Sequence, residues 1–343
     1  MSLSKAIGLI ALIISCYILW QIRQLLLLFF TAIVLATAID RLVQLLQQWV
    51  KQRVWAILLS FAILLFLLTL IFWLIVPAFA DQLQQLIELL PQVFSQIQTG
   101  LNWVENRIDE LDFINIPHID ALLQQLQPYI SQLFAHTFNF FSAYIEAILQ
   151  LVLVLVLSLM LLVNPQPYKL LFIRLFPSFY RRRASEIISH CEVALGNWTT
   201  GVLIQMSFVA LLSGIGLWIL QVPLALAHAI LAGLLDLIPN IGPTLAAVFP
   251  IAIALLDAPW KAVAVLIFYV VIQQVESYWL TPTIMAKQVS LLPAITLIAQ
   301  IVFASFFGAL GLLIALPLTV VAKTWIEEVL FKDFLDKWQQ APS

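Results

Sequence analysis

Long apolar runs, separated by short polar stretches, dominate the chain. A run of about 20 apolar residues is long enough to cross the hydrocarbon core of a bilayer as a helix. Together with the broken runs described next, the pattern predicts an all-α polytopic membrane protein with about six full transmembrane helices. The expected crossings include residues 6–20, 25–39, 54–76, 138–163, 200–220 and 262–272, of which 54–76 and 138–163 are the clearest.

One of the apolar stretches, residues 224–256, contains a predicted helix break. Its two arms of about 14 residues would each reach about 21 Å, less than the core thickness of about 30 Å. Proline and glycine stop a helix, and exposed backbone amides are not tolerated in lipid. We therefore interpret the stretch as a re-entrant hairpin; one kinked helix, or two short full spans, are the alternatives. The tip consists of Pro239, Asn240, Ile241, Gly242 and Pro243.

A second break is predicted near the C-terminus. The arms 293–307 and 312–321 are separated by a segment that contains Gly308 and Gly311. Each hairpin follows a crossing, so residues 200–257 and 258–325 have the layout of two inverted copies. Paired interrupted segments point to the midplane site of a transporter. No sequence identity between the two copies is visible. If each hairpin arm crossed the membrane fully, the chain would end on the same side, so the repeat is a hypothesis.

Charged residues set the expected topology. Short connections rich in Lys and Arg remain cytoplasmic, which places both termini inside. A polar block, residues 81–137, is rich in acidic residues and suits the outer side, as a lid, an assembly surface or a plain helical connector. An aromatic and basic piece, residues 168–176, is typical of a helix in the membrane interface. The expected order is N-terminal transmembrane helices (1–80), outer helical block (81–137), transmembrane helix (138–163), cytoplasmic amphipathic linker (164–199), two helix-plus-hairpin units (200–257 and 258–325) and cytoplasmic tail (326–343).

Composition supports this class of protein. The chain has 343 residues, of which 63% are hydrophobic and 10% charged, with a mean hydropathy of +1.04. Soluble domains have about 25% charged residues. The net charge of −2 gives no reason to expect nucleic acid as a partner. No nucleophile elbow, phosphate-binding loop, dinucleotide fingerprint or metal-ligand spacing is present, and Cys16 and Cys191 suggest no disulfide. We expect no enzyme, no cofactor and no metal, and transport driven by a gradient.

Polar residues within the apolar segments are the candidate functional groups. A carboxylate at the centre of a membrane helix costs about 2.5–3.5 kcal/mol, which is tolerated where function needs it. Asp236 lies one turn before the first tip, where it would bind a cation or proton, or simply reach water. Glu276 follows Gln273 by three positions, so the two should share one helix face, unless Glu276 is only interfacial. Gln205 and Gln300 are further candidates for the pathway, and they suit hydrogen bonding between helices equally well.

The predicted substrate and ion pathway combines these groups with the tip residues. It consists of Asp236, Pro239, Asn240, Gly242, Pro243, Gln205, Gln273, Glu276, Gln300, Gly308 and Gly311.

The run GLLDLIPNIGPTLAAVFP, residues 233–250, resembles the hallmark of the autoinducer-2 exporter family, a bacterial family of permeases. The resemblance covers much of the C-terminal half, and the N-terminal half matches in layout only. The chain departs from the family pattern at Asn240, where an aromatic or aliphatic residue is frequent. Further positions in the family's order are Gln205, Gly214, Gly216, Val222, Pro223, Glu276, Pro282, Pro293, Gly308, Gly311 and Pro317.

The resemblance implies a secondary transporter in the bacterial cytoplasmic membrane, assembled as a homo-oligomer. Family members are described as exporters of the quorum-sensing signal autoinducer-2, and others as sodium or lithium/proton antiporters. We therefore expect export of a small polar solute by alternating access around the two broken hairpins. The alternatives are an antiporter for monovalent cations and protons, and a membrane scaffold that transports nothing.

Overall fold

The computed structural model describes residues 10, 13–15, 17–75, 77, 137–239, 241–280, 282–283 and 292–335. In these ranges the chain is helical and has no β-strand. Five of the described helices are long and apolar enough to cross a membrane, or six if a bent helix pair counts as one span. The predicted all-α polytopic fold is thus confirmed. Residues 81–136 of the predicted outer block, and residues 6–9, 11–12 and 16 of the first predicted crossing, lie outside the described ranges.

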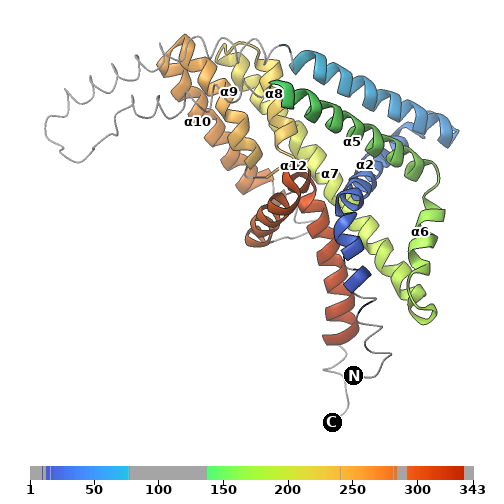
Figure 1. Cartoon of the computed structure of the whole chain (residues 1–343). Helices are drawn as coiled ribbons and strands as arrows, with labels where there is room; N and C mark the ends of the chain where they lie inside the picture. Colours follow the sequence, from blue (N-terminus) through green and yellow to red (C-terminus); the bar gives the residue numbers. More distant parts are fainter. Residues whose placement is uncertain are drawn as a thin grey trace, which may run out of the picture. The chain divides into compact units, whose positions relative to one another are not determined.

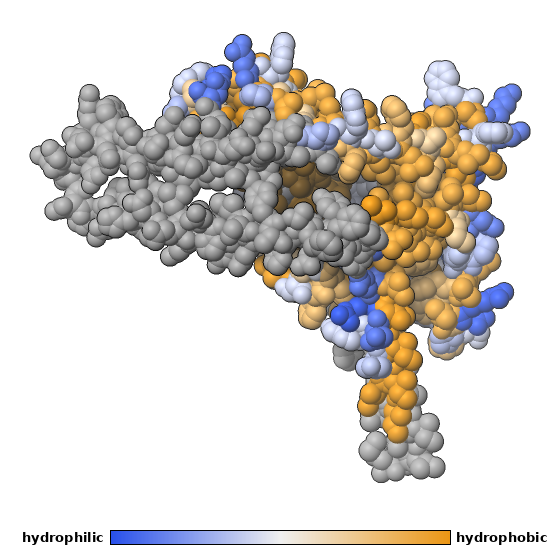
Figure 2. Space-filling model, turned by 45° about the horizontal axis from the view of Figure 1, so that its top comes forward, coloured by the Kyte–Doolittle hydropathy of each residue, from blue (hydrophilic) through white to orange (hydrophobic). Residues whose placement is uncertain are grey.

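The outer surfaces of the described helices are largely apolar (Figure 2). Only 11% of the most apolar stretch of the helix Arg53–Ile75 is buried within the protein. A helix satisfies its own backbone hydrogen bonds, so such a surface is stable against hydrocarbon. This helix has the length, bounds and apolar surface expected of the crossing predicted for residues 54–76.

The chain divides into two compact units. Unit 1 comprises Met1–Leu67, Gln150–Gln205 and Ser277–Ser343, and unit 2 comprises Leu68–Leu149 and Met206–Glu276. The helix α7 (Arg181–Ile219) contributes to both, with unit 2 starting at Met206. At about 1.5 Å per residue, its 39 residues reach about 58 Å, which is far more than one membrane crossing needs.

The helix α2 (Arg23–Leu46) of unit 1 is longer than its apolar run suggested. We expected a crossing at 25–39 followed by a connection at 40–53, but the helix continues through Asp40 and Arg41. The reason is that the buried face continues at helical spacing through Ile39 and Val43. These two residues pack with Ala56, Ile57 and Leu162 in one cluster, so tertiary contacts stabilise the extra turns.

The helix α5 (Thr137–Val163) matches the crossing predicted for residues 138–163. Its stretch Ala147–Val163 is bent by 92° from the next helix, α6 (Pro165–Arg174), and Figure 1 shows this turn. Proline at the first position of α6 allows the new helix to start at once. If α5 crosses the membrane, α6 lies close to the membrane plane, as the pattern of residues 168–176 predicted. A short 3₁₀ helix, η1 (Ser178–Tyr180), leads into α7.

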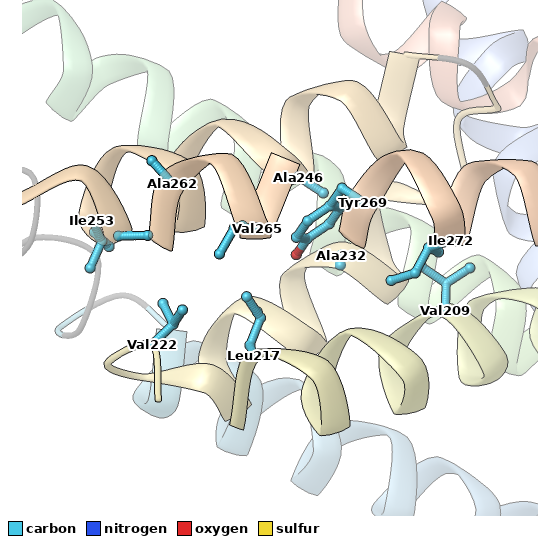
Figure 3. Packing of buried hydrophobic residues seen from close by; sticks show 11 residues of the cluster. Val209, Leu217, Val222, Ala232, Ala246, Ile253, Ala262, Val265, Tyr269 and Ile272 are labelled. Atoms are coloured by element: carbon cyan, nitrogen blue, oxygen red, sulfur yellow. The ribbon is translucent and has the colours of Figure 1, made fainter. Parts of the chain in front are cut away.

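Unit 2 contains the second part of α7 with α8 (Ala225–Leu235), α9 (Ile241–Asp257) and α10 (Pro259–Val275). Figure 3 shows one apolar cluster formed by these helices, in which Tyr269 and Val265 of α10 lie near Leu217 of α7. The cluster also includes several alanines, among them Ala232 and Ala246. Lipid gives no hydrophobic drive for helix association, so such small residues matter because they allow close packing.

The last long helix of unit 1, α12 (Pro293–Trp325), is interrupted at Gly308 and continues into the π-helical segment η3 (Ile326–Leu335). Its two parts correspond to the two predicted arms. The second part extends past residue 321 to Trp325, and the chain then continues as the segment η3.

Candidate functional site at two broken helices

The first helix break lies between α8 and α9 in unit 2, at the predicted tip. The chain leaves α8 through two tight turns, in which the Ile238 N–H donates to the Leu235 carbonyl (2.9 Å) and the Gly242 N–H donates to the Ile238 carbonyl (2.8 Å). Pro239 accepts a bond from the Ile241 N–H (2.8 Å). The tip therefore satisfies several backbone donors locally, as a broken helix at membrane depth requires.

Glycine is essential to this turn at position 242. A β-carbon on Gly242 would lie 1.8 Å from the carbonyl oxygen of Leu235, the last residue of α8. The start of α9 thus packs directly on the end of α8, and α8 and α9 are the two arms of a hairpin. Pro243 beside it is buried and Pro239 is half-buried. Asn240 lies outside the described residues.

Asp236 caps the end of α8 and is only 2% exposed. Its position follows from the packing of α8 on α7: a β-carbon on Gly233 would lie 2.7 Å from the Met206 carbonyl oxygen, and one on Gly214 would lie 3.2 Å from the Ala229 β-carbon. These two pairs define antiparallel helices. Asp236 follows Gly233 by three positions, so it lies on the α7 side of α8. The side chain is therefore buried in protein, and the alternative of a cap that reaches water does not apply.

Unit 2 contains further buried polar side chains outside the predicted pathway. Ser213 of α7 and Tyr269 of α10 are buried, and so is His228 of α8, which lies two turns before Asp236. Figure 3 shows the Tyr269 ring in the middle of the apolar cluster. The sequence signal that could have identified Ser213 and Tyr269 is a hydroxyl group within an apolar run. Burying such a polar group in a membrane protein is costly, so its presence suggests a role.

Contrary to the expectation that they share one helix face, Glu276 and Gln273 lie in different environments. Glu276 is buried at the end of α10, whereas Gln273 is exposed. The helix changes at Glu276 from α to a π-helical turn, Glu276–Leu280. A π turn rotates the following residues relative to the α-helical register, and such turns frequently occur at functional sites. Glu276 is therefore the stronger candidate of the two.

The second break, in unit 1, is a true reversal of the chain. Gly308 has φ 63° and ψ −145°, angles that are essentially restricted to glycine. A β-carbon on Gly311 would lie 2.1 Å from the carbonyl oxygen of Phe303. In a continuous helix these residues would be about 12 Å apart along the axis, so the chain must double back between them. Leu310 at this tip packs on a cluster that includes Leu28, so protein covers the tip in part.

Gln205 and Gln300 are both buried and both belong to unit 1. The predicted pathway residues thus fall into two sets, with Asp236, Gly242 and Glu276 in unit 2. In the described part of the chain no group of three or more His, Cys, Asp or Glu residues has a geometry that could hold a metal ion. The chemistry available at the breaks is that of carboxylates, amides and backbone groups.

A comparison with known protein families gives a match over almost the whole chain. Residues 9–331 match the family described as AI-2E family transporter. The chain belongs to the AI-2E transporter family. The resemblance carried by residues 233–250 is confirmed. The protein is accordingly a multi-pass membrane protein of a transporter family.

Several relatives in this family align over long stretches. TqsA of Escherichia coli (strain K12), an AI-2 transport protein, is 26% identical over 308 residues, which cover 88% of this chain and 85% of TqsA. YueF of Bacillus subtilis (strain 168), whose name assigns it to transport, is 25% identical over 286 residues, or 80% of this chain and 76% of YueF. YhhT of Escherichia coli (strain K12) is 29% identical over 172 residues, or 48% and 46%.

Proposed function

We propose that this protein is a secondary transporter that exports a small polar organic solute of the autoinducer-2 type from a bacterial cell. Family membership and the similarity to TqsA support transport of this class of solute. The single observation that carries the proposal is the pair of glycine-dependent helix breaks, at Gly242 and Gly308, in segments that are otherwise apolar. Interrupted helices provide polar backbone groups where lipid-facing helices have none.

The mechanism that we propose uses each broken hairpin as a moving element in alternating access. The tip backbone would bind hydroxyl or carbonyl groups of the solute, and the buried carboxylates Asp236 and Glu276 would couple its movement to an ion gradient. At the second tip the position of a β-carbon on Gly308 faces open space. A hinge at such a tip needs only a few residues, because these residues can adopt the backbone angles that the movement requires.

Flux into proteoliposomes tests the proposal. Purified protein is reconstituted with a labelled autoinducer-2-type solute, and a proton or sodium gradient is imposed in either direction. We expect uptake that depends on the gradient and that saturates with solute concentration. Protein-free liposomes are the control, and the Gly242→Ala variant, which displaces the first tip, should transport less. If neither the solute nor monovalent cations move under any gradient, the transport proposal is wrong and the scaffold alternative is favoured.

A second candidate, a monovalent cation/proton antiporter, is supported by one specific observation. Asp236 and Glu276 are both carboxylates buried in membrane segments of unit 2. Burial of a charge in such a segment is expensive unless the group has a task or a well-placed partner. In the antiporter, salt-dependent proton flux would occur without any organic solute. Measurement of proton flux with a pH-sensitive dye in solute-free proteoliposomes distinguishes the two candidates.

We also propose the membrane orientation and assembly that the sequence indicates. The basic residues of α6 and of the start of α7 would face the cytoplasm, together with both termini. Homo-oligomerisation stays a prediction from the family resemblance. Accessibility of single cysteines introduced at Arg174 and Asp257 tests the orientation, and light scattering of the purified protein tests the subunit number.

A further inference from the structure

A groove of about 610 Å³ lies in unit 1 between the start of α7 and the segment η3. One wall is formed by Phe176, Phe179 and Tyr180, and the opposite wall includes Trp325, Leu330 and Phe334. This volume is in the range of small-molecule sites, which is about 300–1,000 Å³. The lining is aromatic and aliphatic, so the groove suits a hydrocarbon chain and offers little to a polar solute.

The two walls are held together by specific contacts. The rings of Phe176 and Trp325 stack with their centroids 5.9 Å apart. Arg183 donates hydrogen bonds to Glu328 Oε2 (2.8 Å) and to Asp333 Oδ2 (3.1 Å). The Tyr180 hydroxyl donates to Asp333 Oδ2 (3.4 Å), so the one hydroxyl at the groove is already engaged. The groove is therefore a built feature, because four side-chain contacts fix its width.

The position of the groove indicates contact with the membrane surface. The 92° bend between Ala147–Val163 and α6 occurs where a membrane-spanning helix ends. Beyond the bend, large apolar side chains face outwards, among them Leu171, Leu175 and Phe179. Apolar side chains on a helix parallel to the membrane insert into the boundary between headgroups and acyl chains. A lipid of the adjacent leaflet can thus reach the groove from the side.

The cationic side chain of Arg181 lies beside the groove. Arg181 donates from Nε to the carbonyl oxygen of Phe176 (3.1 Å), the residue that lines the groove. Among the described residues no carboxylate lies within ion-pair distance of Arg181, whereas Arg182 pairs with Glu186 (3.6 Å) and Arg183 pairs with Glu328 and Asp333. Arg181 is an exposed residue, and a guanidinium group matches the geometry of a phosphate group.

We propose that this groove binds an anionic phospholipid, with one acyl chain between η1 and η3 and the lipid phosphate on Arg181. The apolar lining provides for the chain, and the exposed guanidinium of Arg181 provides for the negative headgroup. A bound lipid would bridge the start of α7 and the segment that continues α12, whose other end forms the second hairpin. The site is independent of the transported solute.

Native mass spectrometry of the purified full-length protein in detergent tests the binding. Phosphatidylglycerol is titrated against phosphatidylcholine with the same acyl chains. We expect retention of phosphatidylglycerol over phosphatidylcholine by the wild type, and an affinity about tenfold lower in Arg181→Gln, which corresponds to one lost charge-assisted contact. Arg182→Gln should bind as the wild type does, and Arg181→Lys should retain most of the preference. Equal losses in Arg181→Gln and Arg182→Gln would show unspecific attraction and overturn the site.

Photochemical cross-linking locates the acyl chain. A phosphatidylglycerol with a photoreactive group on one chain is bound and irradiated, and the labelled peptides are identified. We expect labels on residues 176–180 and 325–334, and a clear loss of these labels in Val329→Trp, which fills the groove. Excess phosphatidylglycerol should compete for the label, whereas inorganic phosphate should not. Labels confined to other helices, or labels in the groove only after deletion of residues 336–343, would overturn the proposal, the latter because the chain's own end would be the occupant.

Discussion

The position of a β-carbon on Gly242 lies 1.8 Å from the carbonyl oxygen of Leu235. Two backbone segments thus touch where α8 ends and α9 begins, and no rotation of a side chain can relieve a larger residue there. The buried carboxylate Asp236 follows α8 directly, beside this contact. We therefore propose that transport depends on the geometry of the first tip.

Gly242→Ala should destabilise the protein and impair transport. Atoms cannot approach to 1.8 Å, so the start of α9 must move away from α8. Overpacking of this kind costs about 1–3 kcal/mol. Unfolding in denaturant and solute flux in proteoliposomes measure the two effects. Leu245→Ala, at an exposed position of the same helix, should change stability far less. Full flux in Gly242→Ala would show that the tip does not need this close contact.

Gly308→Ala should cost about 1–3 kcal/mol although the site is open, because the strain is in the backbone. Nothing lies within 4 Å of the β-carbon position, but φ 63° with ψ −145° is unfavourable for alanine. Thermal unfolding in detergent checks this expectation. Ala309→Ser, at the next and exposed position of the helix, is the control and should leave the unfolding temperature nearly unchanged. Equal stability of Gly308→Ala and wild type would contradict the reversal of the chain at this residue.

Asp236→Asn should keep the fold and abolish coupling to the ion gradient. The amide has the shape of the carboxylate but neither binds nor releases a proton. Gradient-driven flux should fall to the level of empty liposomes, with the unfolding temperature little changed. Asp257→Asn is the matched control, because this aspartate lies at the end of α9 and pairs with Lys261 at an exposed position. Coupling that survives in Asp236→Asn would assign the role to Glu276, for which Glu276→Gln is the corresponding test.

Arg183→Gln should destabilise unit 1 by about 2–3 kcal/mol, because it removes charge-assisted hydrogen bonds to a buried carboxylate. The side chains of Arg183 and Glu328 are 26% and 7% exposed. Arg182→Gln removes an exposed pair, with exposures of 94% and 47%, and should cost at most about 1 kcal/mol. Denaturant unfolding of the two variants gives the comparison. Similar losses would mean that the cluster does not hold η3 against α7.

The sequence indicated the crossings well where hydropathy alone decides. The helix Arg53–Ile75 and the helix α5 agree with their predicted runs to within about two residues, the usual uncertainty of helix ends. Prediction failed where packing outweighs local polarity. Asp40 and Arg41 suggested the end of a helix, but Ile39 and Val43 bury the same face on Ala56 and Leu162, so α2 continues.

The candidate site was likewise predictable from the sequence only where local chemistry decides. Proline and glycine in an apolar run predicted both breaks, because the backbone restrictions of these residues are local. The different environments of Gln273 and Glu276 were not predictable, since burial depends on which neighbouring segments cover each residue, and spacing along the helix does not determine this. The buried hydroxyls of Ser213 and Tyr269 were missed because each is a single polar residue on a separate helix.

The sequence by itself determined that the chain is helical, spans the membrane several times, breaks two of its helices and belongs to a transporter family. These properties follow from hydropathy, from backbone chemistry and from a local motif. Only the tertiary structure decided that Asp236 is buried, that Gly311 meets Phe303, and that Arg183 bonds with Glu328, 145 positions away. Contacts between distant segments depend on how helices pack, and hydropathy patterns do not encode this because lipid and protein interior are equally apolar.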